Sequence, residues 1–310
     1  MSTDSYRTAG RIVVGIDGSA QSHVAARWAA RRAQTTGVGL TVLLVTPPLR
    51  VPGRGGSVFA AMRQGVDEFT RQVTEAARKN LAEAEAVVRE EFGELDLETV
   101  MVDDSEPALE LVRASEQAEL VVVGTRGLGA ARAMAMGSVS AHLVAQARGP
   151  VVVVPETGIA EDDRARGTVV VGIEDATQST ETLRAALAEA RRIDGTLLAI
   201  HTWEYDPALS AGLPALDTSM YQPMTKAFDE DLREMVAREV SRTGDDVAVE
   251  TRVSVGRPGE VLVHASHEAE LVVVGSRGAN GLAGVLLGST ARQVVRQSIC
   301  PVMVLPHRKH

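Results

Sequence analysis

Glycine residues recur at the same spacing in both halves of the chain, each time after a run of valines. In the first half, Gly124 and Gly127 are followed, after nine further residues, by Gly137 and Ser138, where an apolar helical pattern begins. Glycine lets the backbone approach a bound group closely, and the start of a helix offers unpaired N–H groups and a positive dipole end. This combination predicts a phosphate-binding segment.

The segment differs from both standard phosphate-binding motifs. The chain contains no Gly-Lys-Ser or Gly-Lys-Thr, and Arg132 stands where a dinucleotide motif starting at Gly127 and Gly129 would have its third glycine. Ser138 has two interpretations, a hydroxyl donor to a ligand or an ordinary helix N-cap. Arg126 either reaches a phosphate or is a solvated loop arginine.

A carboxylate ends the first valine-rich run of the chain. Asp17 follows Gly15 and Ile16 and precedes Gly18 and Ser19. At this position it can accept hydrogen bonds from ribose hydroxyls or from an exocyclic amine, or it can form the turn or cap before the next helix. Ligands of open α/β sheets bind beyond the carboxyl ends of the strands, so we expect Asp17 near the glycine segment.

The chain repeats itself at the scale of whole domains. The segment 118–127 recurs as 269–278 with one Thr replaced by Ser, an offset of 151 residues, and 13–16 and 150–155 recur as 170–173 and 301–306. Residues 156–167 are acidic, contain two glycines and lack apolar periodicity, which indicates a linker. We therefore predict domains at 1–155 and 168–310, joined by the linker 156–167.

Short valine-rich runs alternate with long helical patterns in each copy, and the runs are too continuous for strands with one exposed face. In the first copy we expect strands near 11–17, 40–46, 97–102, 119–124 and 150–155, and helices near 20–36, 66–92, 106–117 and 137–147. In the second copy, Leu183, Leu187 and Ala190 mark the first helix, and Gly195 ends it. The predicted fold is α/β, with a five-stranded parallel sheet in each copy.

Composition excludes several classes of function. The net charge of −9 and the lack of a basic run argue against nucleic acid as a partner. The longest aliphatic runs have the length of a strand and the first residues are polar, so we expect no membrane association and a cytoplasmic location. Cys300 is the single cysteine, which excludes an intrachain disulfide, and its apolar neighbours predict a buried side chain.

With these residues in place, the chain resembles the ATP-binding universal stress proteins over nearly its whole length. The spacing Gly124-x2-Gly127-x9-Gly137-Ser138, repeated from Gly275 to Ser289, is similar to the nucleotide-binding signature of that family. The tandem arrangement and the scarcity of lysine beside arginine are typical of an actinobacterial member. The resemblance implies ATP as ligand, with Mg2+ accompanying its phosphates.

The resemblance also implies which residues surround the nucleotide. Asp17 would contact the adenosine, a backbone group near Thr46 would meet the adenine, and the glycine segment would surround the phosphates. The residues assigned in the first copy are Gly15, Asp17, Thr46, Gly124, Thr125, Arg126, Gly127, Leu128, Gly129, Gly137, Ser138, Val139 and Ser140. Those assigned in the second copy are Gly172, Glu174, Gly275, Ser276, Arg277, Gly278, Gly288, Ser289 and Thr290.

The second copy departs from the first at the adenosine end, where Glu174, Asp175 and Ala176 replace Asp17, Gly18 and Ser19. Glu174 keeps the charge with one more methylene, and Asp175 lacks the freedom of glycine. We therefore expect two nucleotide sites of unequal quality. His201 ends the second strand of this copy, near the expected adenine edge, where it can line the pocket.

The leading functional hypothesis is a regulatory ATP sensor, in which nucleotide binding changes conformation or the binding of a protein partner. The first alternative is an adenylyl transferase or ATP pyrophosphatase, although the loops 125–136 and 276–287 supply only arginines and one asparagine for such chemistry. The second alternative is a nucleotide-free dimerisation module. The proline-bounded final strands suggest edge strands that pair the two domains with each other, with a homodimer as a further step. His264 and His267 lie one turn apart without an evident third ligand, which favours a solvated helix face over a metal site.

Overall fold

The structure is a computed structural model that describes residues 6–48, 57–125, 136–156, 167–175, 179–204, 222–244, 246–277 and 287–307. For residues 57–67 only the backbone is described. The chain divides into two compact units, residues 1–156 and 157–310. Each unit is described by itself.

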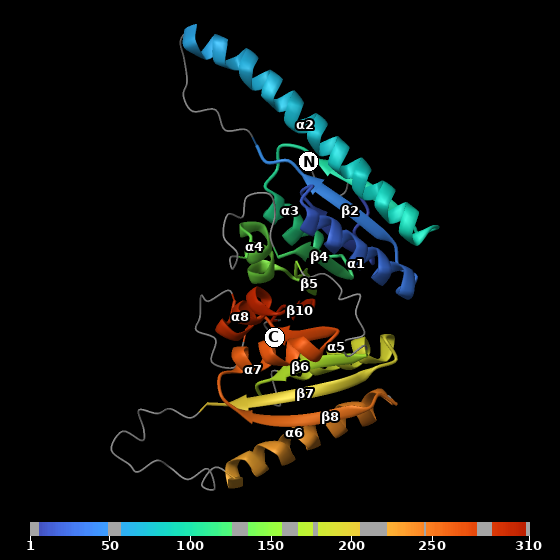
Figure 1. Cartoon of the computed structure of the whole chain (residues 1–310), viewed down its shortest axis with the longest axis vertical. Helices are drawn as coiled ribbons and strands as arrows, with labels where there is room; N and C mark the ends of the chain where they lie inside the picture. Colours follow the sequence, from blue (N-terminus) through green and yellow to red (C-terminus); the bar gives the residue numbers. More distant parts are fainter. Residues whose placement is uncertain are drawn as a thin grey trace, which may run out of the picture. The chain divides into compact units, whose positions relative to one another are not determined.

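The first unit is a parallel sheet with helices between successive strands (Figure 1). Its strands have the order β3-β2-β1-β4-β5, and every neighbouring pair is parallel. Along the chain the elements are β1 (Ile12–Ile16), α1 (Ala20–Thr36), β2 (Leu40–Val45), α2 (Ser57–Phe92), β3 (Leu97–Val102), α3 (Pro107–Ala114), β4 (Leu120–Gly124), α4 (Ser138–Gln146) and β5 (Val151–Val154).

The second unit repeats this topology, with the order β8-β7-β6-β9-β10 and parallel neighbours throughout. Its elements are β6 (Thr168–Ile173), α5 (Thr180–Arg192), β7 (Thr196–Trp203), α6 (Gln222–Thr243), β8 (Val249–Val255), α7 (Pro258–Ala265), the short 3-10 helix η4 (Ser266–Glu268), β9 (Leu271–Gly275), α8 (Ser289–Gln297) and β10 (Val302–Leu305). The predicted fold class is thus confirmed in both units.

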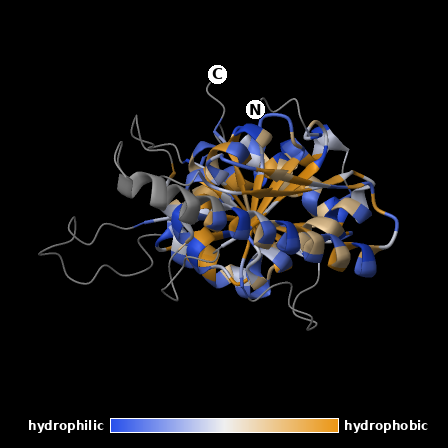
Figure 2. Cartoon of the chain, turned by 90° about the horizontal axis from the view of Figure 1, so that it is seen from above, coloured by the Kyte–Doolittle hydropathy of each residue, from blue (hydrophilic) through white to orange (hydrophobic). Residues whose placement is uncertain are grey.

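The core of each unit is formed by strands that are buried on both faces. The central strands β1, β4, β6 and β9 are valine-rich and almost wholly inaccessible, and hydrophobic residues fill the strands in Figure 2. In the first unit, α1 packs on the sheet through alanines, all of them buried: Ala25, Ala26, Ala29, Ala30 and Ala33. Small side chains there let the helix lie close to the strands. The apolar runs lack alternation because both faces of these strands are buried.

The predicted boundaries agree with the structure to within three residues, with one exception. Helix α2 begins at Ser57 rather than near residue 66, and Phe59, Met62 and Val66 in these added turns lie at helical spacing. Strands β5 and β10 come last in the order of their units, as expected of edge strands. Their pairing with each other stays a prediction.

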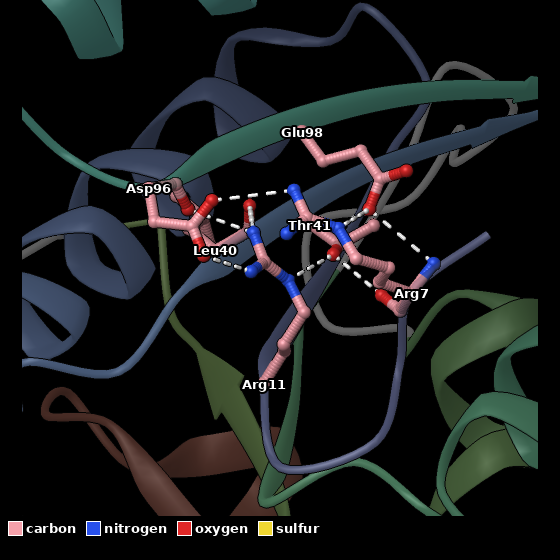
Figure 3. A network of polar contacts seen from close by, with 6 residues as sticks. All are labelled: Arg7, Arg11, Leu40, Thr41, Asp96 and Glu98. Atoms are coloured by element: carbon pink, nitrogen blue, oxygen red, sulfur yellow. Dashed lines mark hydrogen bonds and ion pairs between the residues drawn. The ribbon is translucent and has the colours of Figure 1, made fainter.

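A polar network joins the amino ends of the first three strands of the first unit (Figure 3). The buried guanidinium of Arg11 donates to the Leu40 carbonyl at 2.9 Å and to Thr41 Oγ1 at 3.0 Å, and it forms an ion pair with Asp96. The hydrogen bond from Arg11 holds the pKa of Asp96 below its usual value. This network lies at the edge opposite the expected ligand site and is structural.

Candidate functional site

The strand order of each unit creates a switch point at its first strand. From β1 the chain proceeds to β2 on one side, and it returns to β4 on the other side. Ligands of open α/β sheets bind at such a point, beyond the carboxyl ends of the two strands. Asp17 follows β1 directly and Thr125 follows β4, so the structure brings the predicted adenosine and phosphate segments to one edge. Glu174 and Ser276 take the same places after β6 and β9.

Asp17 forms the turn between β1 and α1. Its Oδ1 accepts a hydrogen bond from the Ser19 N–H at 3.0 Å. Ser19 is the N-cap of α1, and its hydroxyl accepts from the Ser22 N–H at 3.2 Å. The turn-forming role of Asp17 is therefore real, and the half-buried carboxylate lies at the switch point as the ligand interpretation requires.

Gly18 cannot be replaced at this turn without a structural change. Its φ of +84° belongs to the left-handed region, and a Cβ there would come within 2.0 Å of the Asn80 side chain on α2. Asn80 thus lies directly beside the turn that holds Asp17. Sequence reasoning missed Asn80, because nothing in the α2 pattern indicates which polar residue faces the switch point.

The start of α4 has the form that an anion-binding helix terminus needs. Gly137 is the N-cap, and no side chain caps the helix, so Ser138 is the first helical residue and not the N-cap. The Gly137 N–H donates to the Thr125 carbonyl at 2.8 Å, which returns the chain to the end of β4. Ser138 is exposed. The first N–H groups of a helix have no intrahelical partners, so an uncapped terminus is open to an anion.

Ser140 holds this terminus in place. Its buried hydroxyl lies 3.2 Å from the Thr125 carbonyl and 3.1 Å from the Gly137 carbonyl. The hydroxyl of Ser140 thus ties α4 to β4, and the place beside the phosphates that the resemblance implies for Ser140 stays a prediction. Val139 stands between Ser138 and Ser140, partly buried, in the first turn.

The second unit builds the same terminus with different supports. Gly288 is the N-cap of α8, again without a side-chain cap, and its N–H donates to the Ser276 carbonyl at 2.8 Å. Ser289 and Thr290 follow as the first helical residues, and Ser289 is exposed. Ser276 Oγ accepts from the His307 N–H at 3.0 Å, so the C-terminal segment supports this loop.

Thr46, at the end of β2, has most of its polar groups engaged within the protein. Its N–H donates to the Val102 carbonyl at 2.9 Å, its carbonyl accepts from the Ser105 N–H at 3.1 Å, and its hydroxyl donates to Asp103 Oδ1 at 2.8 Å. A backbone contact with adenine therefore depends on the second lone pair of the carbonyl. Asp103 is a second carboxylate at this edge that sequence reasoning did not single out.

Gly15 and Gly172 have a packing role in the structure, and their assignment to the nucleotide stays a prediction. A Cβ on Gly15 would lie 2.9 Å from Leu111 Cδ1, and a Cβ on Gly172 would lie 2.8 Å from Leu262 Cδ1. Helices α3 and α7 thus approach their sheets at these glycines. The glycines are needed for close packing of helix on strand.

The central part of each glycine loop lies outside the described residues. Arg126, Gly127, Leu128, Gly129 and Gly278 belong to this part, so their predicted contacts stay predictions. At the rims, Gly124 and Gly275 are the last residues of β4 and β9. Thr125 Oγ1 lies 3.4 Å from Gln21 Oε1 on α1, and Arg277 is partly buried beside Ser276.

The structure also describes Cys300, the pair His264 and His267, and the helices considered for a membrane span. Cys300 is buried, and burial raises the pKa of its thiol to about 12. The rings of His264 and His267 are 6.3 Å apart, and within the described ranges no group of three or more His, Cys, Asp or Glu residues could hold a metal ion. None of the described helices is both long enough and apolar enough to cross a membrane.

Comparison with known proteins identifies the family of this chain. The universal stress protein family profile matches residues 8–155 and again 166–306. A universal stress protein of Mycolicibacterium smegmatis is 34% identical over 96% of this chain and 97% of its own, and one of Mycobacterium tuberculosis is 35% identical over 94% of both. A crystal structure of a universal stress protein from Archaeoglobus fulgidus, 20% identical, has the same fold with a TM-score of 0.61 over 97% of both chains. The chain belongs to the universal stress protein family, as a member with two tandem domains.

Proposed function

We propose that the protein is an ATP-binding regulatory protein of the bacterial stress response, which acts in the cytoplasm. Binding of ATP, with Mg2+ on its phosphates, would shift the protein between conformations or change its affinity for a protein partner. Any hydrolysis would be slow. The family supports a role in stress, and the groups gathered at the switch point, Asp17 and the start of α4, support a nucleotide ligand.

One observation carries the proposal. In each unit, an uncapped helix start and a carboxylate lie at the carboxyl ends of two neighbouring strands, with Ser138 and Asp17 in the first unit. The helix start suits phosphate, because its N–H groups lack partners and its dipole is positive. The carboxylate suits the hydroxyls of a ribose, which are hydrogen-bond donors. A nucleotide satisfies both ends at once.

The two units differ at the carboxylate end. In the second unit, the backbone N–H of Glu174 donates to Ser179 Oγ at 3.0 Å, so the turn after β6 is tied by the serine at the N-cap of α5. The Glu174 side chain is exposed, whereas Asp17 is half-buried. The first unit therefore holds its carboxylate in a defined position, and we expect it to bind ATP more tightly.

A transferase or pyrophosphatase is the weaker alternative. Within the described part of the first glycine loop, the side chains at the helix start are the neutral Thr125, Ser138 and Ser140. Transfer of a phosphoryl or adenylyl group normally needs a base or a fixed cation at the reacting phosphorus. Mg2+ is then more simply a counterion carried by ATP than an ion held by a protein cage.

Calorimetric titration of the full chain with ATP and Mg2+ tests the proposal. We expect one tight and one weaker site. Asp17→Asn removes the charge but keeps an oxygen for the Ser19 N–H, so the fold should persist while affinity at the first unit falls. A chain that binds no ATP would refute the proposal. Steady production of AMP with an acceptor molecule would favour the transferase.

Pairing of the two domains through their final strands, and a homodimer built from such pairs, remain part of the proposal. Light scattering during size-exclusion chromatography tests the dimer. A mass of 32.8 kDa, that of one chain, would exclude the homodimer and leave the nucleotide proposal intact.

A further inference from the structure

Helix α2 continues well beyond the part of the first unit that supports it. In its carboxyl half, Ala77, Ala84 and Val88 are buried. Residues 68–72, which come just before, are all exposed. Figure 1 shows the amino-terminal turns of α2 running past the strands of its own unit. The unit therefore supports the carboxyl half of this 36-residue helix, and the amino-terminal half projects from it.

The polar contacts that anchor α2 also come from its carboxyl half. Glu91 accepts a hydrogen bond from Arg27 of α1 at 2.6 Å, and Glu85 accepts one from Thr99 of β3 at 3.2 Å. These contacts fix the direction of the helix axis. They do so from the end of the helix that is remote from the exposed turns.

The projecting turns nevertheless carry an apolar stripe. Phe69 is 53% exposed, in a chain that is only 3% aromatic. The apolar residues on this side of the helix follow one another at alternating steps of three and four: Phe59, Met62, Val66, Phe69, Val73 and Ala76. This alternation is the spacing of a coiled-coil seam, which presents a narrow apolar stripe to a second helix. The spacing therefore indicates that the stripe is covered by a helix.

A free helix of this composition would gain little stability of its own. Gly65 lies in the middle of the projecting half, and a glycine inside a helix costs about 1 kcal/mol relative to alanine. Most of the stability of a helix in a protein comes from packing of its apolar face. A partner helix along the stripe would supply this packing.

The stripe is complementary to itself when two copies run antiparallel. With a two-fold axis between residues 67 and 68, each layer of the pair combines a larger residue of one copy with a smaller residue of the other: Phe59 with Ala76, Met62 with Val73, and Val66 with Phe69. Alternation of large and small residues across facing positions is what close packing requires. A parallel pair in register would instead place each phenylalanine against its own copy.

The area of such a pair is sufficient for a dimer. One phenylalanine buries about 150–250 Å², so the four phenylalanines of two copies would contribute about 600–1,000 Å². The smaller residues of the stripe bring the total close to the lower limit of a stable interface, about 1,200 Å². Charge opposes the pairing little, because residues 57–76 hold two arginines and three carboxylates, a net charge of −1, and none of them lies on the stripe.

We propose that residues 57–76 of α2 form a dimerisation surface, which binds the same segment of a second copy of the chain in antiparallel orientation. The equivalent helix of the second unit, α6, has 22 residues and buries Leu232, Met235 and Val236. The chain thus presents one such surface, and a two-fold pair closes it. This inference rests on the homodimer of the proposed function, names its surface, and is independent of nucleotide binding.

Sedimentation equilibrium of the full chain tests the surface. The wild type should have twice the mass of one chain, 32.8 kDa. Phe69→Glu places a charge in the middle of the stripe and should raise the dissociation constant by about 30-fold or more, the effect of losing a central interface residue. Met62→Glu should act in the same way, whereas Phe69→Leu should remain dimeric. Gln64→Glu adds the same charge on the opposite side of the helix and should leave the mass unchanged.

A distance between spin labels tests the orientation. Ala60→Cys introduces a thiol that can be labelled selectively, because Cys300 is buried. In the antiparallel pair the two labels should lie about 22 Å apart along the helix axis, from a rise of 1.5 Å per residue. In a parallel pair they would lie side by side, near the interhelical distance of about 10 Å. The shorter distance alone would refute the antiparallel register.

The possible failures are distinguishable. A wild type that is monomeric at every concentration refutes the homodimer and this surface together, and calorimetry with ATP still decides the nucleotide proposal. A dimer that both Phe69→Glu and Met62→Glu leave intact keeps the homodimer and refutes the surface on α2. Circular dichroism shows whether each variant is folded, and we expect no loss of fold because Phe69 is exposed. Dissociation caused equally by Gln64→Glu would mean that charge, and not the stripe, controls assembly, which would also overturn the inference.

Discussion

Replacement of Ser138 by glutamate would separate the stability of α4 from its capacity to bind phosphate. Ser138 is exposed and is the first residue of a helix that no side chain caps. A carboxylate at this position interacts favourably with the helix dipole. Ser138→Glu should therefore raise the free energy of unfolding of the first unit slightly, by about 0.3–1 kcal/mol.

The same carboxylate would occupy the place of a phosphate and repel it. Two unit charges 4 Å apart interact by about 1 kcal/mol at the dielectric constant of water and by about 4 kcal/mol at the lower value typical of pairs near a protein surface. Because Ser138 is exposed to water, we take the smaller energy, about 1 kcal/mol for each phosphate charge. With two phosphate charges within reach, ATP affinity at the first unit should fall by about 30-fold or more.

Calorimetry with ATP, together with thermal unfolding, measures both effects on one sample. Ser138→Gln has a similar size without the charge, and it should bind ATP far better than Ser138→Glu. Ser289→Glu is the matched change in the second unit and should remove the weaker site only. If Ser138→Glu bound ATP with unchanged affinity and stoichiometry, the start of α4 would not be the phosphate site.

The packing at Gly172 and the ionisable groups of Glu239 and Cys300 can each be tested. Gly172→Ala would force a Cβ to within 2.8 Å of Leu262 Cδ1, and denaturant unfolding should show a loss of about 1–3 kcal/mol; an unchanged midpoint would show that α7 shifts freely. The buried Glu239 carboxylate accepts from Arg184 at 2.6 Å, and this hydrogen bond lowers its pKa below the usual 4.5. Because the folded state lowers this pKa, the carboxylate stabilises the fold above about pH 4.5 and ceases to do so as the pH falls through the lowered value. The stability difference between the wild type and Glu239→Gln should therefore shrink on acidification, and a difference that grows would contradict the assignment. Burial raises the pKa of Cys300 to about 12, so iodoacetamide should not modify the native protein at pH 8 but should modify it in urea, as mass spectrometry would show. Rapid native modification would mean that the C-terminal segment opens.

Several features of the fold were predictable because contiguous residues carry them. Continuous valine runs indicate strands buried on both faces, and the alternation with helical patterns implies parallel crossovers. The repeat of 118–127 at 269–278 doubles this evidence, since two independent copies show the same order of elements. The family assignment followed from the spacing of glycines, which needs no knowledge of distant contacts.

Helix starts were harder to place. Ser138 has the residue type of an N-cap, yet Gly137 takes that position, because the carbonyl of Thr125 binds the Gly137 N–H and sets where the helix begins. The start of α2 at Ser57 was also missed, although Phe59 and Met62 continue the helical spacing of Val66 and Phe69. The N-cap of α4 is set by a contact between segments rather than by local propensity.

The sequence by itself determined the presence of two domains and the succession of strands and helices in each, and it predicted where phosphate could bind. Only the tertiary structure decided which side chains surround those positions. Asn80 lies beside Gly18, Asp103 accepts from Thr46, and Phe228 packs on His201. Each contact joins elements tens of residues apart, and the rotation of a helix about its axis decides which of its polar or aromatic residues faces the site. Local patterns specify that a helix has a buried face, whereas packing against the sheet selects the residue that faces the candidate site.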